Sequence, residues 1–373
     1  MKEGWEYKKI KDIGSVIGGT TPNTNIAEYW DGNFCWISPA ELDGSHYLYD
    51  SRKKITEAAV KAKSLKLLPA GTVILSSRAP IGKVVINKVP TYCNQGFKCV
   101  ICGKEIYNEF LYWWLWGKTE YLNSLGTGAT FKEISKKVVE DITIPVPPLS
   151  EQQSIVDYLD SAFVKIDAMK ANAEKALGEA KALFQASLKE MLEPKEGWEE
   201  KTLPDISENL DSKRKPVTKG KREAGIYPYY GASGIVDYVS DYIFDEDILL
   251  ISEDGANLVA RSTPIAFSVS GKVWVNNHAH ILKFQNIYTQ YFVEYYFASI
   301  KIDEYVTGAA QPKFSQKNMN KLPIWIPSLS EQQSIVETLD SLKSKVDTLQ
   351  ANYAKISQEC DALKQAILRQ VFE

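Results

Sequence analysis

The chain contains one long segment twice. Residues 149–160 read Leu-Ser-Glu-Gln-Gln-Ser-Ile-Val-Asp-Tyr-Leu-Asp, and 180 positions later residues 329–340 read Leu-Ser-Glu-Gln-Gln-Ser-Ile-Val-Glu-Thr-Leu-Asp. A second echo joins the starts of the two halves, where Gly4-Trp5-Glu6 matches Gly197-Trp198-Glu199. Between these anchors the halves diverge almost completely. A period this long is not that of a solenoid, so the sequence predicts one structural plan, used twice, that carries two different inserts.

Both repeated segments predict long helices. Each follows a proline-containing stretch, and the pairs Ser150 with Gln153 and Ser330 with Gln333 have the spacing of a capping box. The apolar positions then alternate in steps of four and three, in the same phase in both copies, and a 3.5-residue period over about four heptads indicates a coiled coil. The expected seam includes Ile155, Leu159, Ile166, Met169 and Leu183 in the first copy, and Ile335, Leu339, Val346, Leu349 and Leu363 in the second. Two unrelated surface helices are the alternative, and the matched phase argues against them.

The length of these helices predicts their arrangement. Each would have about 40 residues and extend about 60 Å, which is more than one globular domain needs. Because the termini of a domain usually lie close together, we expect the second helix to run back along the first as an antiparallel pair with an approximate two-fold axis. The chain therefore divides into a first insert at 1–148, a spacer helix at 149–193, a second insert at 194–328 and a second spacer helix at 329–373.

The two inserts read as mixed α/β domains. Short β-branched and aromatic runs at residues 72–75, 84–86, 247–251 and 272–275 predict strands, separated by turns rich in Gly, Pro, Asn and Ser. Apolar periodicity predicts a helix near residues 109–122 and a counterpart near 290–300. The fold class expected from the sequence is thus α/β, with two mixed domains separated by two long helices.

Composition narrows the functional class. The chain is 44% hydrophobic, begins with a charged stretch and lacks an apolar run of 18 residues, so the sequence predicts a cytoplasmic protein without a membrane partner. The five cysteines are an odd count and favour free thiols over a disulfide framework. The net charge of -3 does not by itself favour a nucleic-acid partner. One segment at residues 211–223 is nevertheless basic, with six Lys or Arg residues against two acids.

Several loops carry side chains suited to DNA. Arg can donate two hydrogen bonds to guanine, Asn or Gln can pair with adenine, and Ser or Thr can contact phosphate. For any single residue, a solvated turn is the competing interpretation. The candidates in the first insert are Thr20, Thr21, Asn23, Ser76, Ser77, Arg78, Asn94 and Gln95. Those in the second are Lys213, Arg214, Lys215, Tyr229, Tyr230, Ser233, Asn277 and His278.

The sequence contains only incomplete matches to motifs for catalysis, cofactor binding or metal binding. Gly117-Lys118-Thr119 lacks the upstream glycine of a phosphate-binding loop and falls in a tryptophan-rich helix. Cys99 and Cys102 have metal-ligand spacing but no second Cys or His pair. His278 and His280 alternate on an expected strand, so one of them should face the core. The sequence therefore predicts a chain without catalytic, cofactor or metal residues.

Taken together, these features resemble the specificity subunit of type I restriction-modification systems. The resemblance covers essentially the whole chain and rests on Pro147-Pro-Leu-Ser-Glu-Gln-Gln153, Pro327-Ser-Leu-Ser-Glu-Gln-Gln333, the Gly-Trp-Glu starts, and Thr307-Gly-Ala-Ala-Gln-Pro312. The segments Tyr227–Val236 and Trp274–His280 also look like a recurrent variety of target-recognition domain. The first half departs from the pattern, with Gly128-Ala-Thr-Phe-Lys132 in place of Gly-Ala-Ala-Gln-Pro.

The resemblance implies a DNA-reading role. Each insert would read one half of a split, asymmetric site in double-stranded DNA, and the helices would fix the gap between the halves. Two methyltransferase subunits would dock on the assembly and flip the target adenine into their own pocket, and restriction motor subunits would join through them. A coiled-coil scaffold with protein-binding inserts and a stand-alone DNA-modifying enzyme are the alternatives. No motif encodes the half-site sequences or the length of the gap.

Overall fold

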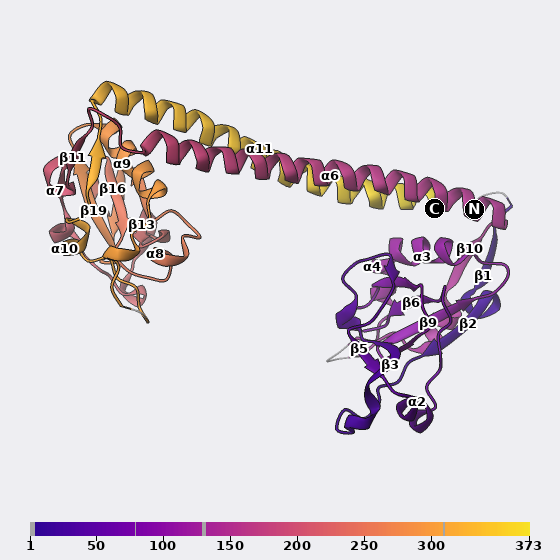
Figure 1. Ribbon diagram of the computed structural model, residues 1–373. Helices are drawn as coiled ribbons and strands as arrows, with labels where there is room; N and C mark the ends of the chain where they lie inside the picture. The colour runs from indigo at the N-terminus through magenta and orange to yellow at the C-terminus, as the bar shows by residue number, and fades with distance from the viewer. Residues whose placement is uncertain (1–3, 79, 129–131, 309) are drawn as a thin grey trace. The chain divides into compact units, whose positions relative to one another are not determined.

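The computed structural model of the chain describes residues 4–78, 80–128, 132–308 and 310–373. These residues form two compact units (Figure 1). Unit 1 comprises Met1–Asn172 with Lys355–Glu373, and unit 2 comprises Ala173–Ala354. Each unit therefore contains an α/β body together with a part of each of two long helices, α6 (Leu149–Leu192) and α11 (Leu329–Phe372).

The body of unit 1 is built on two sheets and a strand pair. The larger sheet has the order β2-β9-β6-β7-β4, the smaller sheet has the order β5-β3-β8, and β1 pairs with β10. The larger sheet contains β2 (Gly14–Gly18), β9 (Phe97–Cys102), β6 (Val73–Ser76), β7 (Val84–Asn87) and β4 (Tyr47–Leu48). The other strands are β5 (Lys53–Ile55), β3 (Trp30–Ile37), β8 (Thr91–Cys93), β1 (Glu6–Lys9) and β10 (Thr143–Val146). The helices are α1 (Ile10–Ile13), α2 (Glu57–Lys63), α3 (Asn108–Gly117), α4 (Thr119–Ser124) and α5 (Lys136–Asp141).

Unit 2 repeats this plan. Its sheets have the orders β12-β19-β16-β17 and β14-β13-β18-β15, and β11 pairs with β20. The first sheet contains β12 (Ser207–Asn209), β19 (Ala279–Phe284), β16 (Ile248–Ser252) and β17 (Ala266–Val269). The other strands are β14 (Gly234–Val239), β13 (Ala224–Gly231), β18 (Lys272–Val275), β15 (Phe244–Asp245), β11 (Glu199–Lys201) and β20 (Ile324–Ile326). The helices are α7 (Leu203–Ile206), α8 (Asn257–Ala260), α9 (Ile287–Ser299) and α10 (Gln316–Met319).

Strand register makes the two bodies comparable residue by residue. In unit 1, β9 pairs antiparallel with β6 and places Lys98 opposite Leu75. In unit 2, β19 pairs antiparallel with β16 and places His280 opposite Ile251. The three-stranded sheet of unit 1 contains one parallel pair, β3 with β8, and the sheet β14-β13-β18-β15 of unit 2 contains another, β13 with β18. The predicted α/β class, the four predicted strands and the predicted helix near residues 290–300 are confirmed, whereas the helix predicted near residues 109–122 is divided into α3 and α4 at Lys118.

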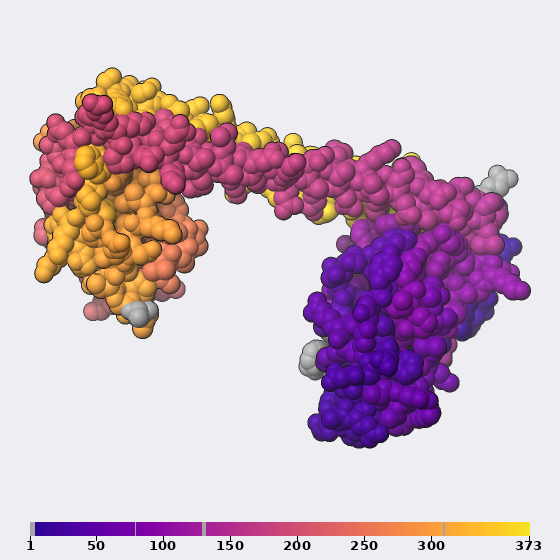
Figure 2. Space-filling model, viewed as in Figure 1, coloured from indigo at the N-terminus to yellow at the C-terminus, as the bar shows by residue number. Residues whose placement is uncertain are grey.

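The long helices run in opposite directions within unit 1. The ammonium of Lys364 lies 2.5 Å from the Asp167 carboxylate, and that of Lys170 lies 3.4 Å from Asp361. As α6 advances by one turn, its partner on α11 steps back by one turn. In unit 2, the end of α6 shares a core with the start of α11, and Figure 2 shows these two segments lying along each other over the body of that unit. The predicted antiparallel packing of two long helices is confirmed.

The heptad seam is only partly correct. Leu159, Ile166, Ile335 and Leu339 are buried as expected, Ile155 and Val346 are half-buried, and Met169, Leu183, Leu349 and Leu363 are exposed. Val156 and Phe163, which lie off the expected seam, are buried instead. A straight helix drifts away from a 3.5-residue repeat, and the α/β bodies cover a second stripe of each helix. Phe163, for example, packs edge-on against Trp113 of α3 at 4.8 Å between ring centroids.

The repeated motif anchors each helix to its body through the same contacts. Glu151 and Glu331 accept a hydrogen bond from the indole N–H of Trp5 and Trp198, at 2.9 and 3.2 Å. Further along, Asp160 accepts from the Trp113 indole at 2.9 Å, and Asp340 accepts from the Tyr295 hydroxyl at 2.5 Å. The echo of the Gly-Trp-Glu starts is explained as well, because its tryptophan is the partner of the motif's glutamate.

The predicted capping box is wrong, and a different glutamine matters. Gln153 and Gln333 bond to the carboxylates of Asp157 and Glu337, one turn ahead. Their neighbours Gln152 and Gln332 are buried and donate to the carbonyls of Pro147 and Pro327, at 2.7 and 2.8 Å. Both helices begin at Leu, so Ser150 and Ser330 lie inside the first turn. The buried glutamines close the turn that joins the last strand of each body to its helix.

Replacing Gln152 by Leu tests this anchor. Its side chain bonds the N–H of Tyr107 at 2.7 Å and the carbonyls of Glu105 and Pro147 at 2.9 and 2.7 Å, and these groups would lose their partner in a buried place. We expect the free energy of unfolding of unit 1 to fall by about 2 to 3 kcal/mol, measured by urea denaturation with hydrogen exchange in β6 and α3. The matched control Gln153→Leu should stay within about 0.5 kcal/mol of wild type. Equal losses for the two variants would contradict the assignment.

Candidate nucleic-acid interface

Four loops of unit 1 meet at one end of its larger sheet. The Thr20 N–H donates to the Cys93 carbonyl at 2.9 Å, and the Thr21 hydroxyl donates to Gln95 Oε1 at 2.5 Å. Ser77 joins two further loops, because its N–H donates to the Gly96 carbonyl at 2.8 Å and its carbonyl accepts from Ile134 N–H at 3.0 Å. The loops at residues 19–23, 76–78 and 94–96, together with the segment leading into Ile134, therefore form one surface. We call it loop cluster 1.

Unit 2 brings together the corresponding loops. The Glu253 N–H donates to the His278 carbonyl at 2.9 Å, and the Phe314 N–H donates to the Glu253 carbonyl at 2.7 Å. Arg214 reaches the same place, where its Nη1 donates to the Ala279 carbonyl at 2.9 Å. The loop between β13 and β14 joins them from the sheet β14-β13-β18-β15, where the Asn276 N–H donates to the Tyr230 carbonyl at 3.1 Å. We call this surface loop cluster 2.

The predicted contact residues differ in accessibility. Thr20, Asn23, Gln95, Lys213, Lys215, Ser233, Asn277 and His278 are exposed, and Thr21, Arg78, Asn94, Arg214 and Tyr230 are half-buried. Ser76, Ser77 and Tyr229 are buried, at 0%, 0% and 1% exposure. Ser76 bonds the Pro80 carbonyl at 2.7 Å and the Tyr229 hydroxyl accepts from Val217 N–H at 3.0 Å. These three side chains lie beneath the surface, so they support the loops and are not placed to touch a ligand directly.

The basic segment has two kinds of cation. Its two arginines are used internally, because Arg214 Nη1 lies 2.6 Å from Glu253 Oε2, while Arg222 pairs with Asp237 at 3.0 Å and stacks over the Tyr229 ring at 4.2 Å. The hydrogen bond from Arg222 also holds the pKa of Asp237 below its ordinary value. Its four lysines are exposed, and among the described residues they form no ion pair: Lys213, Lys215, Lys219 and Lys221.

A buried charge network supports loop cluster 2. Burial acts to raise the pKa of Asp211, but the hydrogen bond and charge of His280 outweigh burial and hold that pKa below its ordinary value. For Glu253 burial again acts upward, and the Arg214 hydrogen bond, with the His280 charge and Lys313, again brings the pKa below its ordinary value. Both carboxylates are therefore ionised near neutral pH. The prediction that one of His278 and His280 faces the core is confirmed, since His280 is fully buried.

Sequence reasoning missed several of these supporting residues. Five residues form ion pairs within the two clusters: Lys98, Glu133, Asp211, Glu253 and Lys313. One signal was available, because Lys98 is a lone charge inside the apolar run of residues 97–102. A charge in a strand of this kind is costly unless it is paired.

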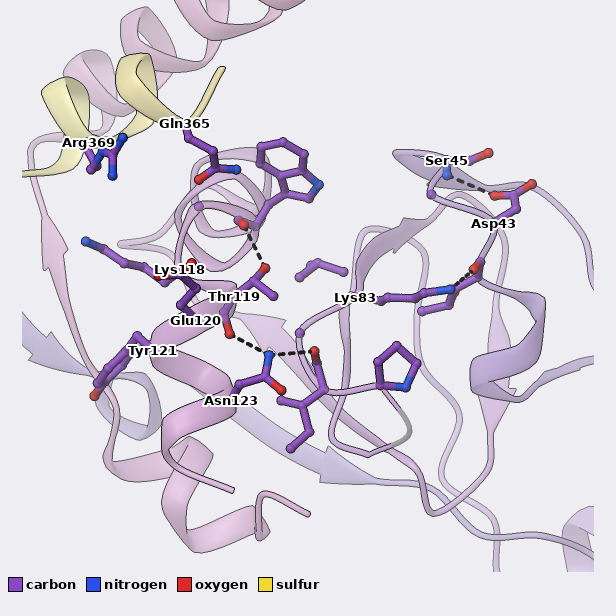
Figure 3. Close-up of a pocket in the computed structure, with 18 of the residues that line it drawn as sticks. Asp43, Ser45, Lys83, Lys118, Thr119, Glu120, Tyr121, Asn123, Gln365 and Arg369 are labelled. Carbon is purple, nitrogen blue, oxygen red and sulfur yellow. Dashed lines mark hydrogen bonds between the residues drawn. The ribbon is translucent and has the colours of Figure 1, made fainter. Parts of the chain in front are cut away.

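A surface hollow of about 880 Å³ lies elsewhere on unit 1 (Figure 3). It is bordered by the junction of α3 and α4 and by Gln365 and Arg369 of α11. Much of its polar lining is already bonded: Lys83 donates to the Leu42 carbonyl at 2.6 Å, and Asn123 donates to the Thr119 carbonyl at 2.9 Å. Within the described residues, no group of three His, Cys, Asp or Glu side chains is placed to hold a metal ion. None of the described helices is both long enough and apolar enough to cross a bilayer.

Comparison with known proteins decides the family. The family model described as "Type I restriction modification DNA specificity domain" matches residues 2–177 and 195–358. The chain belongs to this family. It is thus a DNA specificity subunit of the type I restriction-modification kind, the non-catalytic component of such a system, and the resemblance seen in the sequence is confirmed.

Individual relatives cover the chain to different extents. Over 163 residues it is 45% identical to the specificity subunit of the type I restriction enzyme MjaIX of Methanocaldococcus jannaschii, which is 43% of this chain and 38% of that protein. The EcoprrI specificity subunit of Escherichia coli matches at 25% identity over 379 residues, covering 95% of this chain and 90% of that subunit.

Two solved structures share the fold of this chain. A chain from work on complex assembly and conformational transition of the type I R-M system has a TM-score of 0.80 at 18% identity, covering 100% of this chain and 98% of that one. The HsdS subunit from Thermoanaerobacter tengcongensis has a TM-score of 0.64 at 18% identity, covering 100% and 97%. At this level of identity the likeness establishes the fold alone.

Adjacent residues of the basic segment should respond differently to substitution. Arg214→Met leaves the half-buried Glu253 carboxylate without its closest cation, so we expect unit 2 to lose about 3 kcal/mol of its free energy of unfolding. Lys213→Met alters an exposed side chain and should change that free energy by less than about 0.5 kcal/mol. Urea denaturation of the two variants measures the difference. A stable Arg214→Met protein would show that the arginine is not part of the support.

Proposed function

We propose that this specificity subunit reads a split, asymmetric site in double-stranded DNA, with loop cluster 1 reading one half and loop cluster 2 the other. The observation that carries the proposal is the pair of clusters themselves. The same loops meet at the same end of corresponding sheets, yet they present different side chains. Cluster 1 exposes Thr20, Asn23 and Gln95, whereas cluster 2 exposes Lys213, Ser233 and Asn277. Two equivalent platforms with different surfaces fit two different half-sites.

The exposed side chains divide by chemistry. The amides of Asn23, Gln95 and Asn277 can each offer a donor and an acceptor to the N6 and N7 of adenine in the major groove. The four lysines of the basic segment are flexible cations and suit phosphate oxygens, which set register and affinity. The arginines hold the segment in place, and the lysines are available to DNA. Because the chain has a net charge of -3, we propose that these lysines and the partner subunits together provide the affinity for DNA.

The partners we propose are methyltransferase subunits, two per chain, with restriction motor subunits joining through them in the cytoplasm. The long helices offer exposed apolar side chains for such docking, including Tyr158, Val164 and Met169 on α6 and Leu349 and Leu363 on α11. Exposed apolar side chains on a helix favour contact with another protein. The partner would carry out methylation, and this chain would select the DNA sequence that is methylated.

Mapping of methylated adenines tests this function. The chain should direct a type I methyltransferase subunit to a split motif, and exchanging residues 1–148 for those of another specificity subunit should change one half of the motif and leave the other intact. Exchanging residues 194–328 is the matched control and should change the opposite half. A continuous motif, or a change in both halves after either exchange, would overturn the proposal. Unchanged methylation in every chimaera would favour a scaffold.

The four lysines should control the salt dependence of DNA binding. Replacing Lys213, Lys215, Lys219 and Lys221 by Met should flatten the slope of log affinity against log salt by about 0.9 for each phosphate that is no longer neutralised. The selected sequence should stay the same, because phosphate contacts carry no base information. Met substitutions at four exposed helix lysines, Lys175, Lys181, Lys343 and Lys345, form the control. An equal flattening in the control set would show that the basic segment has no special role.

A further inference from the structure

A single buried ammonium joins the loops of cluster 1. The Lys98 side chain is 9% exposed, and its Nζ lies 3.0 Å from Ser77 Oγ, 3.3 Å from the Gln95 carbonyl and 3.0 Å from Glu133 Oε1. These acceptors belong to three different loops. Lys98 itself lies on β9, a strand paired on both sides, by β2 and by β6. A charge fixed to the rigid interior of the sheet therefore holds three surface loops.

His280 occupies the corresponding place in unit 2. It sits opposite Ile251 as Lys98 sits opposite Leu75, on a strand that is again paired on both sides. Its Nε2 lies 2.8 Å from the Phe314 carbonyl and its Nδ1 lies 2.6 Å from Asp211 Oδ2. A carbonyl and an ionised carboxylate can only accept, so both ring nitrogens donate and the ring is an imidazolium. It is also a buried cation, and it joins the loop of Asp211 to the segment ending at Phe314.

The residues around Lys98 differ from those at the corresponding positions around His280. Ser77 of unit 1 corresponds to Glu253 of unit 2, since each follows the equivalent strand and makes the same two backbone bonds. Glu133 likewise corresponds to Lys313, so the charge at this position is reversed: Glu133 pairs with Lys98, whereas Lys313 pairs with Glu253. The buried cation is the feature that both clusters keep. If this position served stability alone, an apolar side chain would suffice, because apolar packing often stabilises a protein as well as a buried ion pair does.

We infer that Lys98 and His280 are the positioning residues of the two loop clusters, each holding its loops in the geometry that sequence discrimination requires. The inference rests on the proposed function and adds the residues on which discrimination depends. Base reading by hydrogen bonds needs groups placed to within about 0.5 Å, which loops alone do not provide. Charge-assisted hydrogen bonds are short and directional, and here they come from the most rigid part of each body.

Substitution of the two cations tests the inference in the complex with the methyltransferase subunit. Lys98→Met keeps the length of the side chain and removes its charge, and His280→Phe keeps a planar ring without donors. With Lys98→Met, discrimination against single-base changes in the first half-site should fall at least about tenfold, while discrimination in the second half-site is unchanged. His280→Phe should give the reverse, so each variant is the control for the other. Lys98→Arg should recover most of the missing discrimination.

Hydrogen exchange provides a readout that does not depend on activity. In Lys98→Met, the amides of Ser77 and Ile134 should exchange at least about tenfold faster, because they bridge the released loops, while β6 and β9 stay protected. In His280→Phe, the amides of Glu253 and Phe314 should respond in the same way. Lys104→Met, at an exposed site of unit 1, should leave exchange and discrimination unaltered.

The outcomes separate this inference from the proposed function. If the wild-type chain directs methylation to no split site, the proposed function fails. If the wild type reads a split site and Lys98→Met discriminates as well as wild type, the positioning role alone is overturned. It is overturned also if Lys98→Met weakens specific and non-specific DNA binding equally and lowers the melting temperature, because that pattern is loss of folding. The positioning role is supported if Lys98→Met loses discrimination in one half-site while its affinity for non-specific DNA is unchanged.

Discussion

The structure depends on how each long helix is fixed to the α/β body beside it. A helix attached by apolar packing alone can slide or rotate, because apolar contacts have no preferred direction. Hydrogen bonds are directional, and the repeated motif supplies a glutamate, a glutamine and an aspartate for this purpose. Glu151, Gln152 and Asp160 bind an indole, a carbonyl and a second indole in unit 1. Glu331, Gln332 and Asp340 make the corresponding bonds in unit 2, so the two bodies meet their helices in the same local geometry.

The difference between the residues that fix the helices and the residues of the loop clusters explains why only some segments are repeated in the sequence. Residues that bind helix to body must match in both halves, because the contact is the same. Residues in the loop clusters are under no such constraint, and they differ at the corresponding positions of the two units. The offset between corresponding residues also changes from strand to strand, since the connecting loops differ in length. An alignment at a single shift therefore detects the motif and misses the sheets, although the strand registers of the two bodies correspond.

The sequence was sufficient for the class of fold, and insufficient for the support of the site. Helices α6 and α11 and the strands β6, β7, β16 and β18 follow from local periodicity, which is a property of neighbouring residues. The buried roles of Gln152, Lys98 and His280 depend on partners far away in the chain, such as Tyr107 and Glu133. No local pattern distinguishes Gln152 from Gln153, so the sequence prediction selected the exposed glutamine and a capping box that the structure does not contain. The same limit applies to Ser77 and Tyr229, whose loops were identified but whose side chains point inward.

Electrostatics then determines what the two clusters can present to a ligand. A guanidinium that is bonded to Glu253 or Asp237 has little capacity left for a phosphate or a base, so Arg214 and Arg222 shape the basic segment from within. Lysine in their place would supply the charge but not the planar fork that spans a carboxylate and backbone carbonyls at once. The exposed lysines have the opposite property, since a flexible ammonium follows a phosphate backbone without fixing a single geometry. In the basic segment, the arginines therefore fix the conformation and the lysines are left to bind phosphate. Because these roles lie on different residues, the exposed side chains of a cluster can change while the residues that support it stay the same.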